Sequence, residues 1–235
     1  MTTTPETTTE ESFGAEVSGA LHAEFDLSGE VDGFATNTGL SNEKLAMWAF
    51  LGSECLLFGA LISTYFLYRG RSVTGPTPQQ IYDIPFTSVS TFVLPMSSLT
   101  MVLALAAIQR GDDRRMRIWL LSTAFLGTVF LGSQVYEFTS FIHEGLTIKT
   151  NLFGSSFYVL TGFHGAHVTV GVMMLLSLVA LSSKGRLPQA KAEVVEIAGL
   201  YWHFVDIVWI VIFTVVYLIP SPHTPKPAVP PLQIR

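Results

Sequence analysis

The sequence predicts an all-α protein, an integral membrane bundle of five transmembrane helices. Five long apolar stretches, separated by short polar segments, run through a chain of 235 residues of which only 13% are charged. Because a soluble domain carries about a quarter charged residues, much of this chain is expected to lie out of water. A backbone in hydrocarbon must satisfy its own hydrogen bonds, so apolar runs of about 20 residues are expected to be helical.

The five spans are predicted in chain order, and polar segments divide them. Arg69, Gly70 and Arg71 end the first span, RGDDRRMR at 110–117 follows the second, and SSKGRLPQAK at 182–191 follows the fourth. The third and fourth spans exceed the minimum length for crossing a bilayer, so we expect them to tilt or protrude. The predicted spans are 45–68, 88–108, 116–142, 152–181 and 197–219.

Segments on either side of the transmembrane domain, 44–219, have compositions of their own. Residues 1–43 carry nine of the 18 acidic residues and no Lys or Arg, which predicts an acidic, disordered tail. Residues 220–235 contain six prolines, which favour an extended tail. Nowhere does the chain show the basic footprint of a nucleic-acid-binding protein, so no nucleic acid is expected as a partner.

The basic residues of the loops predict an orientation. With a cytoplasmic N-terminus, eight Lys and Arg fall on the inner side and five on the outer side. Since inner loops are enriched in Lys and Arg, we expect residues 1–43 to be cytoplasmic and residues 220–235 to be external.

Seven polar residues lie inside the predicted spans, where lipid is a poor solvent for them. An ionisable side chain at mid-membrane costs at least about 2.5–3.5 kcal/mol on insertion scales. Each is therefore expected to face protein, water or a lipid headgroup. The seven are Glu54, Gln134, Glu137, His164, His167, His203 and Asp206.

Glu54 lies near the middle of the first span and shares a face with Phe58, Leu61 and Tyr65. A carboxyl at this depth is expected to be neutral or engaged with a partner. One interpretation is a carboxyl that handles protons or contacts a headgroup. The alternative is a purely structural, hydrogen-bonded acid.

The other six polar residues form three pairs with i, i+3 spacing, which places both members of each pair on one helix face. Three His and two carboxylates could bind a metal ion. However, di-iron bundles use Glu-x-x-His pairs, and HExxH is absent here. We therefore expect a helix-packing polar network, with no metal and no catalytic residue. Gln134 and Glu137 are expected to hydrogen-bond between helices, and His–Asp contacts are expected to fix the imidazoles.

Three further residues are candidate contacts for lipid headgroups: Lys184, Arg186 and Trp202. Basic side chains attract anionic lipids at the membrane surface. Trp202 shares a helix face with Trp209, and aromatic residues at this spacing are typical of helix packing or of the interfacial belt. The single cysteine, Cys55, allows no disulfide, and the sequence holds no CxxCH haem-attachment motif.

Four segments together resemble subunit III of the haem-copper oxidases, over nearly all of 44–219. Ser53–Glu54 is followed by Phe58 and Tyr65–Phe66, and a second match ends in the run from Gln134 to Glu137. The other two are long blocks, FGSSFYVLTGFHGAHVTVG from Phe153 and YWHFVDIVWIVIF from Tyr201.

The resemblance implies an accessory role in a respiratory complex. Such a subunit holds no cofactor, because haem and copper belong to subunits I and II. It contacts subunit I directly. The complex also contains subunit II and smaller subunits, and as a whole it reduces oxygen to water and pumps protons. It supports proton uptake by subunit I and holds phospholipids. Glu54 corresponds to the family's buried glutamate.

Mitochondrial members of the family have seven helices, so five helices imply a prokaryotic plasma membrane. The resemblance favours cytochrome c oxidase, with quinol oxidase as the alternative because both share these motifs. An accessory protein of a nitric oxide reductase is a related possibility. A stand-alone transporter is less favoured, because transporters often contain inverted repeats and broken helices, and the sequence shows no clear repeat.

Overall fold

The structure, a computed structural model, describes residues 41–69, 84–187 and 191–219. The chain separates into two compact units, Met1–Asn42 and Glu43–Arg235, and the helices described here belong, from Glu43 onward, to the second. The predictions for the Pro-rich tail, and for the acidic tail up to residue 40, lie outside the described residues.

Five helices make up the described part of the chain, in which no strand occurs. All five are long and apolar enough to cross a membrane, which confirms the predicted all-α bundle of five transmembrane helices. The last of them continues for one turn as a π-helix, η2. The elements are α2 (Asn42–Tyr68), α4 (Ile84–Gln109), α5 (Asp113–His143), α6 (Leu152–Ser183), α7 (Ala192–Phe213) and η2 (Thr214–Leu218).

Several helices begin before the apolar runs that revealed them. α5 begins at Asp113 and includes a polar first turn, and α7 begins at Ala192, five residues before its predicted start. Polar residues are stable there because they cap exposed N–H groups. Asp112 accepts a hydrogen bond from the backbone N–H of Arg115 at 2.9 Å, and Asn151 caps α6 by accepting from Gly154 N–H at 2.6 Å.

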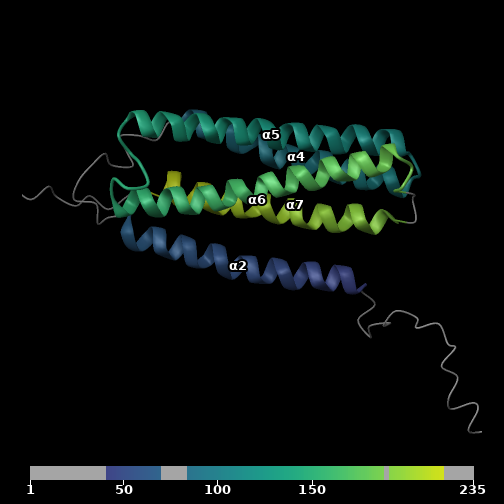
Figure 1. Cartoon of the computed structure of the whole chain (residues 1–235), viewed down its shortest axis with the longest axis horizontal. Helices are drawn as coiled ribbons and strands as arrows, with labels where there is room; N and C mark the ends of the chain where they lie inside the picture. The colour runs from purple at the N-terminus through teal and green to yellow at the C-terminus, as the bar shows by residue number, and fades with distance from the viewer. Residues whose placement is uncertain (1–40, 70–83, 188–190, 220–235) are drawn as a thin grey trace, which may run out of the picture. The chain divides into compact units, whose positions relative to one another are not determined.

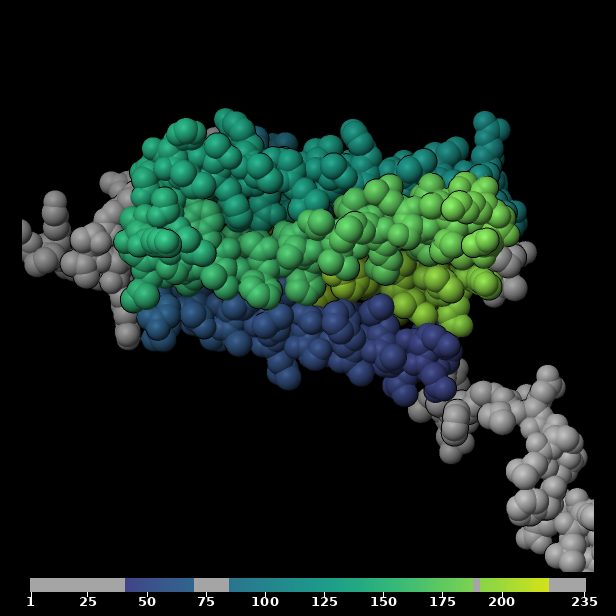
Figure 2. Space-filling model, viewed as in Figure 1, coloured from purple at the N-terminus to yellow at the C-terminus, as the bar shows by residue number. Residues whose placement is uncertain are grey.

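Helices α4 to α7 pack around a shared apolar core, and α2 lies along one side of them (Figure 1). Of the most apolar 18-residue stretch of α7, 50% is buried, whereas only 11% of the corresponding stretch of α2 is buried. The space-filling view shows α2 as a strip with a broad exposed surface of its own (Figure 2). Therefore α7 is the most enclosed of the described helices, and α2 depends on a few side chains for its attachment.

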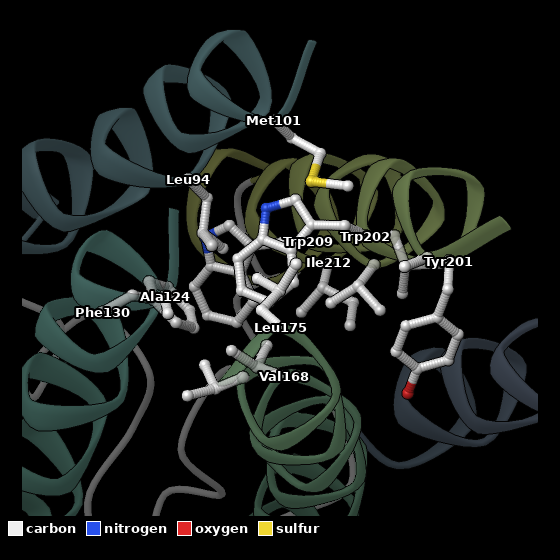
Figure 3. Packing of buried hydrophobic residues seen from close by; sticks show 14 of the residues in the cluster. Leu94, Met101, Ala124, Phe130, Val168, Leu175, Tyr201, Trp202, Trp209 and Ile212 are labelled. Carbon is white, nitrogen blue, oxygen red and sulfur yellow. The ribbon is translucent and has the colours of Figure 1, made fainter. Parts of the chain in front are cut away.

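Trp202 of α7 joins the other three core helices (Figure 3). Its side chain is fully buried, and its indole N–H donates to the Ser97 hydroxyl of α4 at 2.9 Å. A Cβ added at Gly127 of α5 would lie 2.5 Å from the indole ring, and one at Gly171 of α6 would lie 2.8 Å from it. The two glycines thus form a notch that fits the ring, as small residues do where membrane helices approach closely.

Gly127→Ala is expected to lower the free energy of unfolding by about 1–3 kcal/mol, because the added methyl group must displace a fully packed indole. Gly132→Ala is the matched control, since a Cβ at this second glycine of α5 meets nothing within 4 Å. Thermal unfolding of the purified protein in mild detergent measures both. Equal midpoints for the two variants would contradict the tight fit at Trp202.

Candidate functional site

The mid-span carboxyl of α2 contacts a histidine of α6. Glu54 Oε2 lies 3.1 Å from Nε2 of His167. The side chains are 14% and 16% exposed respectively, so the contact lies at the seam between the two helices. This pairing gives the carboxyl the partner that its depth in the span requires.

The hydrogen bonds of His167 determine how many protons the pair holds. Its Nδ1 lies 2.8 Å from the carbonyl oxygen of Phe163, which can only accept, so Nδ1 carries a hydrogen. The contact between Nε2 and Glu54 then needs one further proton, on either group. The pair is either a neutral acid with a neutral imidazole or a carboxylate with an imidazolium. Both forms have zero net charge, which reduces the cost of placing two ionisable groups within the membrane.

Aromatic side chains surround this pair. The ring of Phe58 lies 5.2 Å from that of His167 and 6.4 Å from that of His164, in edge-on arrangements. The hydroxyl of Tyr201 donates to the backbone oxygen of His167 at 3.0 Å. The face of α2 predicted to carry Glu54 and Phe58 is therefore the face that meets α6.

His164 occupies a different environment, although it is only three residues from His167. It is fully buried, and its ring stacks on Trp209 at 4.8 Å and meets Phe130 edge-on at 5.9 Å. Among the described residues, neither ring nitrogen has a hydrogen-bond partner. The two predicted histidines thus differ: one forms an aromatic core contact and the other a polar contact with α2.

The third predicted pair is joined by a serine of α4. The Ser98 hydroxyl lies 2.9 Å from Nδ1 of His203 and donates to Oδ2 of Asp206. The other carboxyl oxygen, Oδ1, is buried and has no hydrogen-bond partner within the described ranges. Among the described residues, the expected direct His–Asp hydrogen bond between two helices does not occur. Instead, Ser98 of α4 bridges two residues of the same helix, His203 and Asp206.

Gln134 and Glu137 of α5 bond to different neighbours. The Gln134 amide donates to the backbone oxygen of Thr161 in α6 at 2.7 Å. Glu137 Oε1 accepts from the hydroxyls of Thr87 in α4 at 2.7 Å and of Tyr217 in η2 at 3.0 Å. Both residues thus make hydrogen bonds between helices.

Charged side chains near the two ends of α2 fasten it to the last helix, a feature absent from the sequence analysis. Lys44 Nζ lies 2.9 Å from Oε2 of Glu196 in α7. Arg69, beyond the other end of α2, donates from Nη1 to the backbone oxygen of Val215 in η2 at 3.3 Å. The signal in the sequence was the presence of basic residues at both ends of an apolar span.

The candidate headgroup residues separate into two groups. Lys184 and Arg186 are exposed just after α6. Trp202 is fully buried in the core, so it offers no surface to a headgroup and that expectation is wrong. Its indole ring fills the notch between helices instead of lying in an interfacial belt.

The polar groups described here support hydrogen bonding and proton exchange. Within residues 41–69, 84–187 and 191–219, no group of three or more His, Cys, Asp and Glu side chains is placed to hold a metal ion. The Glu54–His167 pair, with one proton shared between two partly exposed groups, is therefore the candidate functional site.

Ser98→Ala is expected to destabilise the protein by about 1–3 kcal/mol, because it removes the bridge between His203 and the buried carboxyl of Asp206. Ser90→Ala is the control on the same helix, since the Ser90 hydroxyl donates to the backbone oxygen of Phe86 within α4. Thermal unfolding in detergent compares the two. A Ser98 variant as stable as the Ser90 variant would show that the bridge contributes little.

Comparison with known proteins identifies the family. A family described as cytochrome c oxidase subunit III matches residues 20–221. The chain is 38% identical over 202 residues to cytochrome c oxidase subunit 3 of Bacillus sp. (strain PS3), covering 84% of this chain and 98% of that protein. It is also 38% identical over 198 residues to quinol oxidase subunit 3 of Bacillus subtilis (strain 168), covering 84% of this chain and 96% of that protein.

A third relative, cytochrome c oxidase subunit 3 of Thermostichus vulcanus, is 39% identical over 176 residues, covering 74% of this chain and 86% of that protein. The family match, residues 20–221, includes all five helices of the described structure. The chain is therefore a multi-pass membrane protein that belongs to the subunit III family of the haem-copper oxidases, and it is an accessory subunit of an oxidase complex.

Proposed function

We propose that this chain supports sustained turnover of a proton-pumping cytochrome c oxidase without being catalytic itself. In this proposal it holds no redox centre, contacts subunit I directly, and assembles with subunit II and smaller subunits that complete the complex. The observation that carries the proposal is the Glu54–His167 contact of 3.1 Å at the seam between α2 and α6.

The pair is suited to exchanging a proton at the membrane-facing surface of the subunit. Both side chains retain part of their exposure in the isolated chain, so a neighbouring subunit, a lipid headgroup or water can reach them. One proton between two bases can move from one group to the other with no change in net charge. The proposed role is to keep proton uptake into subunit I effective over many turnovers.

Cytochrome c is the proposed electron donor, since the family that matches is described as cytochrome c oxidase subunit III. Quinol is the second candidate, because relatives named quinol oxidase subunit 3 match at the same 38% identity. The relatives described above are named as subunits of cytochrome c oxidase or quinol oxidase, which supports these two donors over the nitric oxide reductase and transporter alternatives.

The proposed location is a prokaryotic plasma membrane, with the N-terminus cytoplasmic and the C-terminus external. The start of α2, the α4–α5 turn and the end of α6 lie at the same end of the bundle (Figure 1). This end carries Lys44, Arg110, Arg115 and Lys184, in agreement with the positive-inside rule. Lys184 and Arg186 are proposed to contact lipid headgroups there, since both are exposed.

Purification of the chain in mild detergent is expected to retain subunits I and II. Mass spectrometry identifies the co-purified subunits, and an absorption spectrum of the complex identifies its haems. A Cu-A centre or a haem c in subunit II would support cytochrome c as the donor. A complex without either centre that oxidises quinol would contradict the proposed donor, and recovery of the chain alone would contradict the accessory role.

Glu54→Gln is expected to leave the initial rate of oxygen consumption unchanged and to make the complex inactivate several-fold faster during turnover. The amide retains the shape and can still donate to His167, but it cannot exchange a proton. Oxygen consumption is followed over many turnovers, with subunit content checked on a gel.

Glu144→Gln is the matched control, because Glu144 is an exposed residue at the C-terminal end of α5. Glu54→Ala separates packing from proton exchange, because it also removes the polar contact between α2 and α6. A Glu54→Gln complex that matches wild type in inactivation rate, lipid content and pumping ratio would leave only a structural role for this carboxyl.

A further inference from the structure

A cavity of about 540 Å³ lies where α4 turns into α5, at the end of the bundle that also contains the start of α2. It is separate from the Glu54–His167 pair. Its lining combines two arginines and one aspartate with apolar side chains and a tryptophan: Leu103, Ala107, Arg110, Asp112, Arg115, Ile118 and Trp119. We propose that this cavity binds the phosphate of an anionic phospholipid, with the start of an acyl chain along its apolar wall.

The turn that forms the cavity is rigidly built. Gly111, with φ of 75°, lets the chain reverse directly after α4. The Gly111 N–H donates to the Ile108 oxygen at 2.9 Å and the Asp112 N–H to the Ala107 oxygen at 3.0 Å, which is the Schellman arrangement. Asp112 then caps α5 immediately. The two arginines are therefore held on opposite sides of a fixed turn, so binding needs little reorganisation of the backbone.

The charges of the lining match one phosphodiester. Asp112 Oδ2 lies 3.2 Å from Nε of Arg115, and Arg110 Nε donates to the Ala106 oxygen at 2.9 Å. Within the described part of the chain, no hydrogen bond engages the terminal Nη atoms of either arginine, so both remain able to donate to an anion. Two arginines and one carboxylate give a lining charge of +1, which a single phosphodiester neutralises.

The apolar wall favours a lipid over a free anion. Leu103 precedes Arg110 by two helical turns, so the lining extends about 10 Å from the charged turn toward the membrane interior. Ala107 and Ile118 continue that wall, and Trp119 contributes an aromatic ring of the kind enriched at membrane interfaces. A free phosphate would use only the arginines, whereas a phospholipid uses the whole cavity.

The test compares lipid binding to the intact, delipidated oxidase complex by native mass spectrometry. Vesicle-derived phosphatidylglycerol and phosphatidylcholine are added separately to wild type and to an Arg110→Gln/Arg115→Gln variant. The variant is expected to bind phosphatidylglycerol to this subunit roughly 10- to 30-fold more weakly, because two phosphate-binding charges are lost near the membrane surface. Phosphatidylcholine, with no net charge, is expected to bind weakly to both.

The matched control is Arg114→Gln/Arg117→Gln, which removes the same charge from the same segment but from residues outside the cavity lining. This control is expected to bind phosphatidylglycerol like wild type. Three results would overturn the proposal. The first is an equal loss of phosphatidylglycerol binding in the control variant, and the second is equal binding of both lipids by wild type. The third is displacement of phosphatidylglycerol by inorganic phosphate at the concentration at which phosphate alone binds. The last result would identify a free-anion site. None of them depends on the proposed role of Glu54.

Discussion

The insertion of one indole ring into a notch of glycines determines how this bundle is arranged. Trp202 of α7 fills the space left by Gly127 and Gly171 and hydrogen-bonds to Ser97, so one side chain touches α4, α5 and α6 at once. Its placement determines where the neighbouring residues of α7 point. Tyr201 reaches the backbone of His167, and His203 and Asp206 reach Ser98. The polar contacts of α7 therefore depend on the packing of the Trp202 ring.

Helix α2 is attached to the bundle by fewer packing contacts than the other helices. Only 11% of its most apolar window is buried, so the helix gains little from packing. Its buried side chains are Leu51, Phe58 and Tyr65. Polar contacts add to them at three levels: Lys44 near one end, Glu54 in the middle and Arg69 beyond the other end. The candidate proton site thus lies at the most weakly packed seam of the described structure, where a carboxyl can be partnered and still remain accessible.

The sequence allowed the number of spans and their polar residues to be predicted, because length, apolarity and the cost of charge in lipid are local properties. The partners of those residues depend on tertiary packing. Residues three apart differ by about 60° around a helix. This angle is enough to direct His167 to α2 and His164 to the Trp209 ring. Ser98 carried no signal, since serine is common in membrane helices. Trp202 was misassigned because a tryptophan that fills a core notch and one in an interfacial belt look alike in sequence.

The dependence of the core on α7 also bears on the order in which the protein is made. A ribosome completes α4, α5 and α6 before it reaches Trp202. The helices that carry Gly127 and Gly171 are therefore made before the ring that packs between them. Contacts that do not involve α7, such as the hydrogen bond from Gln134 of α5 to Thr161 of α6, can form at that stage. Arrival of the final helix would then lock the arrangement. During synthesis of this protein, the side chain that joins the other three core helices is therefore added last.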